Sequence, residues 1–179
     1  TQSKVRVFSE AAGTSNYAYP NPNPAYMETT PKRKPFVAGN WKMNPGSLSS
    51  AESLANLVKV SANALKRDRG DLPQINIGVA PPLAFIPTVK EILRDTDVLV
   101  GAQDLHWESK GAFTGGISAE QLKSIGADFV LCGHSERRSV FKESDADIAK
   151  KVKAALNQKL DVVLCVGETL EEYKNGLVD

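Results

Sequence analysis

Short apolar runs that recur along the chain, with helical patterns between them, constrain the fold more than any other feature of this sequence. Each run is rich in Val, Ile, Leu or Phe with almost no polar alternation, as a parallel strand covered on both faces requires. Their starts lie 22–39 residues apart, the spacing of right-handed parallel crossovers. The runs are FVAGNW at 36–41, INIGVA at 75–80, DVLVGA at 97–102, ADFVLC at 127–132 and DVVLCV at 161–166.

The segments between these runs carry apolar residues at helical spacing, so the chain alternates strand and helix. Ser49 and Glu52 have the spacing of a capping box at the start of the first helix. Two architectures fit this α/β order, a doubly wound open sheet and part of a (β/α)8 barrel. The expected helices span 49–69, 83–94 and 144–158, and shorter ones begin near Ser118 and Thr169.

Residues 1–35 differ in composition from the rest of the chain. Five prolines between Pro20 and Pro35 remove backbone donors, and no helical or strand period is present. We therefore expect a disordered tail over 1–35 and one folded domain over 36–179. The tail is basic, and we interpret it either as the remnant of an organelle transit peptide or as a plain N-terminal extension.

Composition excludes several classes of protein. The formal net charge is +1, which argues against an electrostatic grip on nucleic acid or on anionic lipid. No apolar stretch approaches the ~18–20 residues that span a bilayer. Cys132 and Cys165 lie inside apolar runs, which favours reduced, buried thiols in an intracellular protein. Two histidines and two cysteines give no metal-ligand spacing, so no metal is expected.

Polar residues that follow the apolar runs are the candidates for chemistry, because both architectures place function at the carboxyl ends of strands. Lys42 lies between Trp41 and Met43. It is either a solvated loop charge or a cationic clamp for a phosphate or enolate-like oxygen, with Asn40 projecting to the same side. The candidates are Asn40, Lys42 and Asn44; Gln103, Asp104 and His106; His134, Ser135, Glu136 and Arg137; and Glu168 and Thr169.

His134 opens the loop after the fourth run. If Ser135 and Glu136 begin a helical turn, backbone N–H groups point at the imidazole and favour its neutral form. A neutral ring can donate a hydrogen bond to a substrate carbonyl. The alternative is a histidine at the edge of the core, satisfied by the backbone.

Four segments closely resemble the triosephosphate isomerase family, in order and in spacing. They are GNWKMN at 39–44, AQDLHWESKGAFTGGIS at 102–118, GHSERR at 133–138 and CVGE at 165–168. The resemblance covers the chain from Lys34 onward and implies a (β/α)8 barrel, of which five βα units are present here. It also implies an enzyme of glycolysis and gluconeogenesis that interconverts dihydroxyacetone phosphate and D-glyceraldehyde 3-phosphate through an enediolate, with no cofactor.

The resemblance assigns roles to five residues at the strand ends. Asn40 and Lys42 match substrate-binding residues of the family, Lys42 being the cation near the phosphate and the enediolate oxygens. His134 matches the neutral electrophile that polarises the carbonyl, so His134 and Lys42 are the expected catalytic residues. Ser135 and Glu136 match the residues that support His134 and Lys42.

The resemblance also implies a homodimer with a triose phosphate as its small-molecule substrate. Met43, Gln103 and Thr114 match dimer contacts, and Thr114 is expected to reach toward the active site of the partner. Gly116 departs from the family, which usually has a glutamate there, so one salt bridge between subunits is not expected. Nothing points to nucleic acid or to a membrane as a partner.

The catalytic base of the family is a glutamate in an A-Y-E-P-V-W segment after the sixth barrel strand. The 179 residues contain no such segment, so we expect this polypeptide alone to be inactive. Two alternatives stay open from the residues: a doubly wound phosphate- or nucleotide-binding domain, and a non-catalytic truncated isomerase that binds a partner protein. The expected location is cytoplasmic, with a plastid as the alternative.

Overall fold

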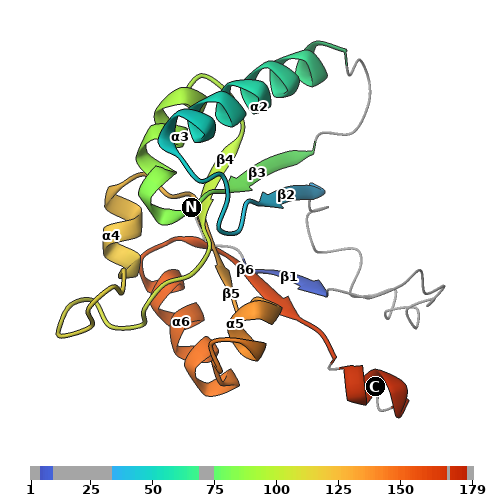
Figure 1. Cartoon of the computed structure of the whole chain (residues 1–179), viewed down its shortest axis with the longest axis vertical. Helices are drawn as coiled ribbons and strands as arrows, with labels where there is room; N and C mark the ends of the chain where they lie inside the picture. The colour runs from blue at the N-terminus through green and yellow to red at the C-terminus, as the bar shows by residue number, and fades with distance from the viewer. Residues whose placement is uncertain (1–4, 10–33, 69–74, 169, 177–179) are drawn as a thin grey trace, which may run out of the picture.

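A curled sheet of parallel strands, with helices packed on its outer face, makes up the protein (Figure 1). The computed structural model describes residues 5–9, 34–68, 75–168 and 170–176. The sheet has the order β1-β6-β5-β4-β3-β2. Its strands are β1 (Val5–Ser9), β2 (Phe36–Asn40), β3 (Asn76–Ala80), β4 (Leu99–Ala102), β5 (Phe129–Cys132) and β6 (Asp161–Val166).

Helices connect these strands, as the apolar spacing predicts. None of the helices in the described part of the chain combines the length and apolarity needed to cross a membrane. The expected helix over 83–94 is a short 3-10 turn followed by an α-helix. The elements are α2 (Leu48–Asp68), η1 (Leu83–Phe85), α3 (Ile86–Leu93), α4 (Ala119–Ser124), α5 (Ser135–Ser139), α6 (Asp145–Asn157) and α7 (Leu170–Lys174).

Strands β2 to β6 lie side by side in sequence order. A doubly wound sheet reverses its strand order at a switch point, so that alternative is wrong. Sequential parallel strands with crossover helices on one face are the arrangement of a (β/α)8 barrel. The five apolar runs therefore form five consecutive barrel strands, as the sequence predicts.

The helix starts test the capping predictions. Ser118 caps α4 with a complete box, in which its hydroxyl accepts the N–H of Gln121 and the Gln121 side chain returns to the backbone of Ser118. The predicted box of Ser49 and Glu52 is wrong. Helix α2 begins one residue earlier, at Leu48, and the Ser47 hydroxyl accepts the N–H of Ser50 at 3.2 Å. Several serines lie close together at this helix start, and each of them is able to cap it. Ser47 is the cap, because its hydroxyl faces the free N–H groups.

One part of the expected tail lies in the sheet. Val5–Ser9 forms β1 and pairs in parallel with Val162–Val166 of β6. The expectation of a tail without strands therefore does not hold for these five residues. Residues 1–4 and 10–33 of the expected tail, and the predicted helix start at Thr169, lie outside the described residues.

The two faces of the sheet carry separate apolar clusters. The larger one fills the space between sheet and helices and includes Ile86, Val130 and Val162. The smaller one lies on the inner, concave face and consists of Ala80, Phe129, Leu131 and Val163, with Phe36 and Leu99 packed against it. Because side chains alternate between faces along a strand, β5 supplies Val130 to one cluster and Phe129 to the other.

The ring of Phe129 lies across the inner face of the sheet because β4 and β3 each have a glycine beneath it. A Cβ atom at Gly101 would overlap the ring of Phe129, and one at Gly78 would lie 3.0 Å from it and 2.8 Å from Phe36. The rings of Phe129 and Phe36 meet edge to face, with their centroids 5.4 Å apart. Gly78 and Gly101 therefore let β5 contact β2 across β4 and β3.

This packing predicts that one methyl group added at Gly101 destabilises the protein. We expect Gly101→Ala to lower the free energy of unfolding by about 1–3 kcal/mol, because overpacking forces the Phe129 ring off its position. Urea unfolding of the two proteins measures the difference. Gly46→Ala is the matched control, since nothing lies within 4 Å of a Cβ atom at Gly46. Equal losses in the two variants would contradict the account.

Candidate active site

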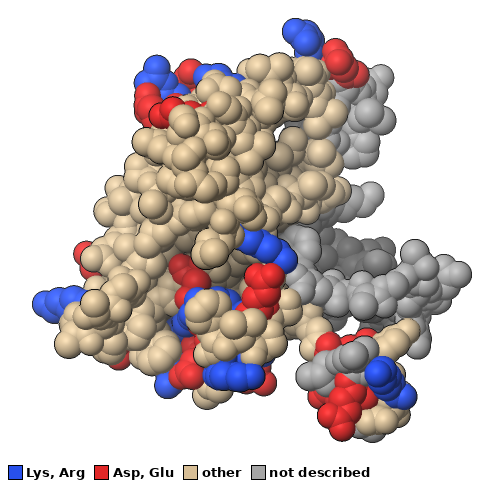
Figure 2. All heavy atoms as spheres, viewed as in Figure 1, with Lys and Arg blue, Asp and Glu red and all other residues tan. Residues whose placement is uncertain are grey.

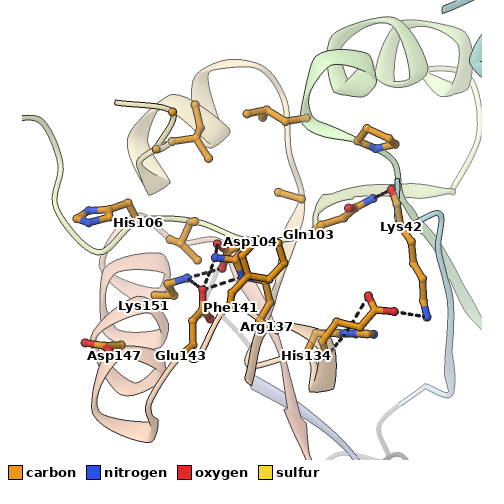
Figure 3. Close-up of a pocket in the computed structure, with 18 of the residues that line it drawn as sticks. Lys42, Gln103, Asp104, His106, His134, Arg137, Phe141, Glu143, Asp147 and Lys151 are labelled. Atoms are coloured by element: carbon orange, nitrogen blue, oxygen red, sulfur yellow. Dashed lines mark hydrogen bonds and ion pairs between the residues drawn. The ribbon is translucent and has the colours of Figure 1, made fainter. Parts of the chain in front are cut away.

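The carboxyl ends of β2, β4 and β5 meet at a cavity of about 760 Å³. Figure 3 shows its side chains converging from these strand ends. Basic and acidic side chains alternate on the surface beside it, over α5 and α6 (Figure 2). The cavity brings together most of the residues expected at the site, but neither Ser135 nor Thr114 lines it. The lining includes Asn40, Lys42, Met43, Gln103, Asp104, His134 and Glu136.

Lys42 reaches across the cavity from β2 to α5. Its Nζ donates a hydrogen bond of 2.8 Å to Oε1 of Glu136, 94 residues further along the chain. Its backbone has a φ of 53°, in the left-handed region that few non-glycine residues adopt. Its N–H donates to Oδ1 of Asn40 at 2.9 Å, which helps to hold this conformation. Asn40 and Glu136 thus fix the lysine at its backbone and at its ammonium group.

Gln103, the residue after β4, also holds the backbone turn at Lys42. Its Nε2 donates hydrogen bonds of 2.8 Å to the carbonyl oxygens of Lys42 and of Ala80. The sequence analysis named Gln103 among the strand-end candidates and as a match to a dimer contact, but missed this link within the chain. A polar side chain directly after a buried strand was the available signal. The glutamine connects the ends of β2, β3 and β4.

His134 is the N-cap of α5, and the sequence predicts that helical turn correctly. Its Nδ1 accepts the N–H of Glu136 at 3.2 Å. An imidazole nitrogen that accepts a hydrogen bond carries no proton, so Nε2 carries the proton of the neutral ring. The nearest carboxylate oxygen, Oε2 of Glu136, is 3.6 Å from Nδ1, too far for a hydrogen bond to compete. The side chain is only 10% exposed.

Glu136 hydrogen-bonds to both Lys42 and His134. Ser135 precedes it as the exposed first residue of α5. The hydrogen bond from Lys42 holds the pKa of the Glu136 carboxyl below its usual range. The carboxylate is about half exposed, so its ion pair with Lys42 contributes positioning more than stability. The resemblance implies a supporting role for Glu136, and that role stays a prediction.

A second group of charged side chains lies deeper beside the same cavity, and we call it the buried ionic cluster. It consists of Asp104, Arg137, Glu143 and Lys151, which point toward one another in Figure 3. Lys151 Nζ lies 2.6 Å from Asp104 Oδ1 and 2.5 Å from Glu143 Oε1. Arg137 Nε donates to Glu143 Oε1 at 2.7 Å, and its Nη2 lies 3.0 Å from Asp104 Oδ2.

The two carboxyl groups of this cluster respond differently to burial. Desolvation raises the pKa of Asp104 despite the nearby Lys151. Desolvation also opposes ionisation of Glu143, but hydrogen bonds from Arg137 and Lys151 outweigh it and leave the pKa of Glu143 lowered. Oε2 of Glu143 is buried and has no hydrogen-bond partner among the described residues. The sequence analysis missed Glu143 and Lys151, because their own segment shows only the start and one face of a helix.

Cys132 and Cys165 are both buried and form no disulfide, as predicted. Burial raises the pKa of Cys132 to about 12, so its thiol stays protonated and unreactive at neutral pH. In the described ranges, no group of three or more His, Cys, Asp or Glu side chains is arranged to hold a metal ion.

Two of the three residues expected at a dimer contact lie on the surface, whereas Gln103 is half-buried. Met43 is 92% exposed beside Lys42, and Thr114 is exposed in the loop that follows β4. His106 anchors that loop, because its ring stacks on Trp107 at 4.3 Å and contacts Phe113 at 4.1 Å between centroids.

The buried ionic cluster predicts a large penalty for losing its lysine. We expect Lys151→Met to lower the free energy of unfolding by about 3–5 kcal/mol, because Asp104 and Glu143 are left with Arg137 alone and one carboxylate charge stays uncompensated inside the protein. Lys153→Met is the control, since Lys153 is exposed on the same helix, and about 0.5 kcal/mol or less is expected there. Chemical unfolding of both variants makes the comparison. A Lys151→Met protein as stable as the control would show that the cluster does not hold these elements.

The ion pair of Lys42 and Glu136 predicts a pH dependence. The folded-state pKa of Glu136 is lowered, so the pair is fully present above the unfolded carboxyl pKa of ~4.3 and is lost as the pH falls through the folded value. We expect the side-chain carboxyl carbon of Glu136 to titrate in NMR below a free glutamate. In Lys42→Met the midpoint should rise toward the ordinary value. Identical midpoints in the two proteins would contradict the pairing.

Comparison with known proteins adds to this geometry. The triosephosphate isomerase family matches residues 35–179. The triosephosphate isomerase of Alkaliphilus metalliredigens is 45% identical over 140 residues, which cover 78% of this chain and 53% of the relative. That of Chlamydia trachomatis serovar L2 is 41% identical over 157 residues, 88% of this chain and 55% of the relative.

A solved structure agrees in fold as well as in sequence. The triosephosphate isomerase of Bartonella henselae superposes with a TM-score of 0.69 at 39% identity, over 82% of this chain and 57% of that one. The chain spans about half the length of the curated relatives it matches. Five consecutive strands of a (β/α)8 barrel and a family match from residue 35 onward lead to one conclusion: this chain belongs to the triosephosphate isomerase family.

Proposed function

We propose that these residues form one half of a triosephosphate isomerase that interconverts dihydroxyacetone phosphate and D-glyceraldehyde 3-phosphate. The observation that carries the proposal is the joint placement of Lys42 and a neutral His134 at one cavity, both tied to Glu136. The reaction moves a proton between carbon and two oxygens, so it needs a cation for the developing oxyanion and a group that exchanges protons with it.

Lys42 supplies the cation in this proposal. Its ammonium group is held by Glu136 at the cavity, and the side chain is 53% exposed, so a phosphate or enediolate oxygen can approach it. Asn40, which fixes the lysine backbone, lies at the end of the same strand and lines the cavity. Preorganised charge of this kind stabilises an oxyanion without reorganising during the reaction.

His134 supplies the hydrogen-bond donor. With Nδ1 accepting from the backbone, Nε2–H donates to the substrate carbonyl and then exchanges its proton between the two oxygens of the enediolate. A glutamate base paired with a neutral histidine is the established arrangement in this family. Ser135 and Glu136 are positioning residues in this scheme, since they lie at the start of α5, which His134 caps.

The remaining proposals rest on the family. The glutamate base of the family lies in a segment that the 179 residues do not contain, so we propose that this polypeptide by itself does not isomerise. We also propose a homodimer through Met43, Gln103 and Thr114, with exposed Met43 offering apolar surface to a partner. The proposed location is cytoplasmic, with a plastid as the alternative, and the proposed pathways are glycolysis and gluconeogenesis.

Two measurements on the 179-residue chain test these proposals. We expect no turnover of either triose phosphate above the uncatalysed rate. In NMR, we expect 2-phosphoglycolate, whose carboxylate mimics the planar enediolate, to shift the His134 ring signals. Lys42→Met should weaken that binding about tenfold to a hundredfold, because it removes a charged contact to the ligand.

The control for binding is Lys153→Met, which removes an exposed lysine from another part of the surface and should leave the affinity unchanged. Turnover by the isolated chain would refute its inactivity and would require a base among the residues present. Equal affinities of the Lys42→Met and Lys153→Met proteins would refute the role of Lys42. A stable chain that binds no phosphate analogue would favour the alternative of a non-catalytic interaction protein.

A further inference from the structure

The second arginine of the segment GHSERR at 133–138, Arg138, lies outside the buried ionic cluster. Its guanidinium group lies against the ends of β5 and β6. Nε donates a hydrogen bond of 2.7 Å to the carbonyl of Gly133, directly after β5, and Nη2 donates one of 3.2 Å to the carbonyl of Cys165 in β6. Nη1 contacts Oδ1 of Asp145 at 2.5 Å. One side chain therefore ties two strand ends to the first residue of α6.

His134 lies between two peptide groups, and Arg138 holds both of them. The preceding peptide group carries the carbonyl of Gly133, which accepts the Nε–H of Arg138. The following one carries the carbonyl of His134 itself, which accepts the backbone N–H of Arg138 at 3.1 Å. Rotation about φ or ψ of His134 would turn one of these rigid groups. The two hydrogen bonds therefore hold the φ of −52° and the ψ of 144° from which the imidazole projects.

Gly133 leaves the space that this guanidinium group occupies. Its φ is +73°, in the left-handed region that glycine adopts without a steric penalty. A Cβ atom there would lie 2.9 Å from Nη2 of Arg138 and 3.1 Å from two side-chain atoms of Ile148. The glycine thus permits the turn that precedes His134 and also admits the arginine that holds it.

The partners of Arg138 fix the plane of its guanidinium group. The donors of a guanidinium form a rigid planar fork, so contacts of Nη1 with Asp145 and of Nη2 with Cys165 also set the direction of Nε–H. The Arg138 side chain is 32% exposed and that of Asp145 is 90% exposed, so their ion pair contributes orientation more than stability. The hydrogen bonds to the two carbonyls are charge-assisted and are the stronger part of the arrangement.

We propose that Arg138 is a positioning residue for His134. By holding the peptide groups on both sides of the histidine, it keeps Nδ1 at the N–H of Glu136, 3.2 Å away, and directs Nε2–H to the carbonyl of a bound substrate. Arg138 is not among the residues that line the cavity, so it acts on a ligand only through His134. The inference rests on the proposed function for what His134 does, and on the hydrogen bonds alone for how it is held.

Arg138→Lys tests the proposal, because it keeps the positive charge and the backbone N–H that His134 accepts. A lysine ammonium group lacks the planar fork and cannot replace all three guanidinium contacts. In the parent chain, long-range proton–nitrogen NMR should show the Nε2–H tautomer of His134. In Arg138→Lys, we expect the two ring-nitrogen signals to move toward the average of the two tautomers, and the amide proton of Glu136 to move upfield as its bond to Nδ1 weakens.

Arg94→Lys is the matched control, since Arg94 is an exposed arginine whose ion pair with Glu91 lies within α3 and its end. The His134 signals should not change there. Asp145→Ala is the second variant, because it removes one contact of the guanidinium group at an exposed position and leaves Arg138 in place. It should move the His134 signals in the same direction as Arg138→Lys, but less. A folded Arg138→Lys protein with the ring signals of the parent would overturn the proposal, and if that protein does not fold, unchanged signals in Asp145→Ala would do so.

Binding of 2-phosphoglycolate separates this inference from the proposed function. We expect Arg138→Lys to weaken the binding about threefold to tenfold, because a displaced donor loses alignment with the ligand, and Arg94→Lys to leave it unchanged. A parent chain that binds no 2-phosphoglycolate would refute the proposed function, while the tautomer of His134 still decides whether Arg138 positions the ring. Weaker binding by Arg138→Lys with unchanged ring signals would overturn the positioning role, since the loss would then not pass through His134.

Discussion

The contact of Phe129 with Phe36 across two glycines is the interaction on which the rest of the structure depends. The rings come from β5 and β2, and Gly101 and Gly78 of the intervening strands leave room for them. In a flat parallel sheet, β2 and β5 would lie about 14 Å apart, because two other strands lie between them. Packing on the concave face curves the sheet, and the curvature brings the end of β2 toward the end of β5. Lys42 can then contact Glu136.

Two kinds of ion pair lie at the resulting cavity and have different roles. The pair of Lys42 and Glu136 is half exposed, so it contributes little stability and leaves the ammonium group accessible to a phosphate. The pair of Lys151 and Glu143 is nearly buried, and it ties the loop after α5 to α6. Since a buried charge is costly without its partner, the deeper pairs fix the framework. The more exposed pair is the one in which Lys42 is suited to exchange the carboxylate of Glu136 for a ligand.

Much of the fold follows from local sequence. The run at 161–166 is a strand with the predicted bounds, and Ser118 and Ser144 cap their helices as their spacing indicates. At the site, the sequence brings Asn40, Lys42, His134 and Glu136 to strand ends that do meet. The misses share one cause. Gln103, Glu143 and Lys151 act through partners that are distant in sequence, and no local pattern records such partners.

The sequence by itself determined the alternation of strands and helices and the family, because these depend on short-range periodicity and on motifs. Only the tertiary structure decided which carbonyls Gln103 holds, which carboxylates share Lys151 and what covers the edge of β6. Val5–Ser9 shows the difference most clearly. Its local pattern gives no partner, and it is a strand only through its parallel pairing with β6.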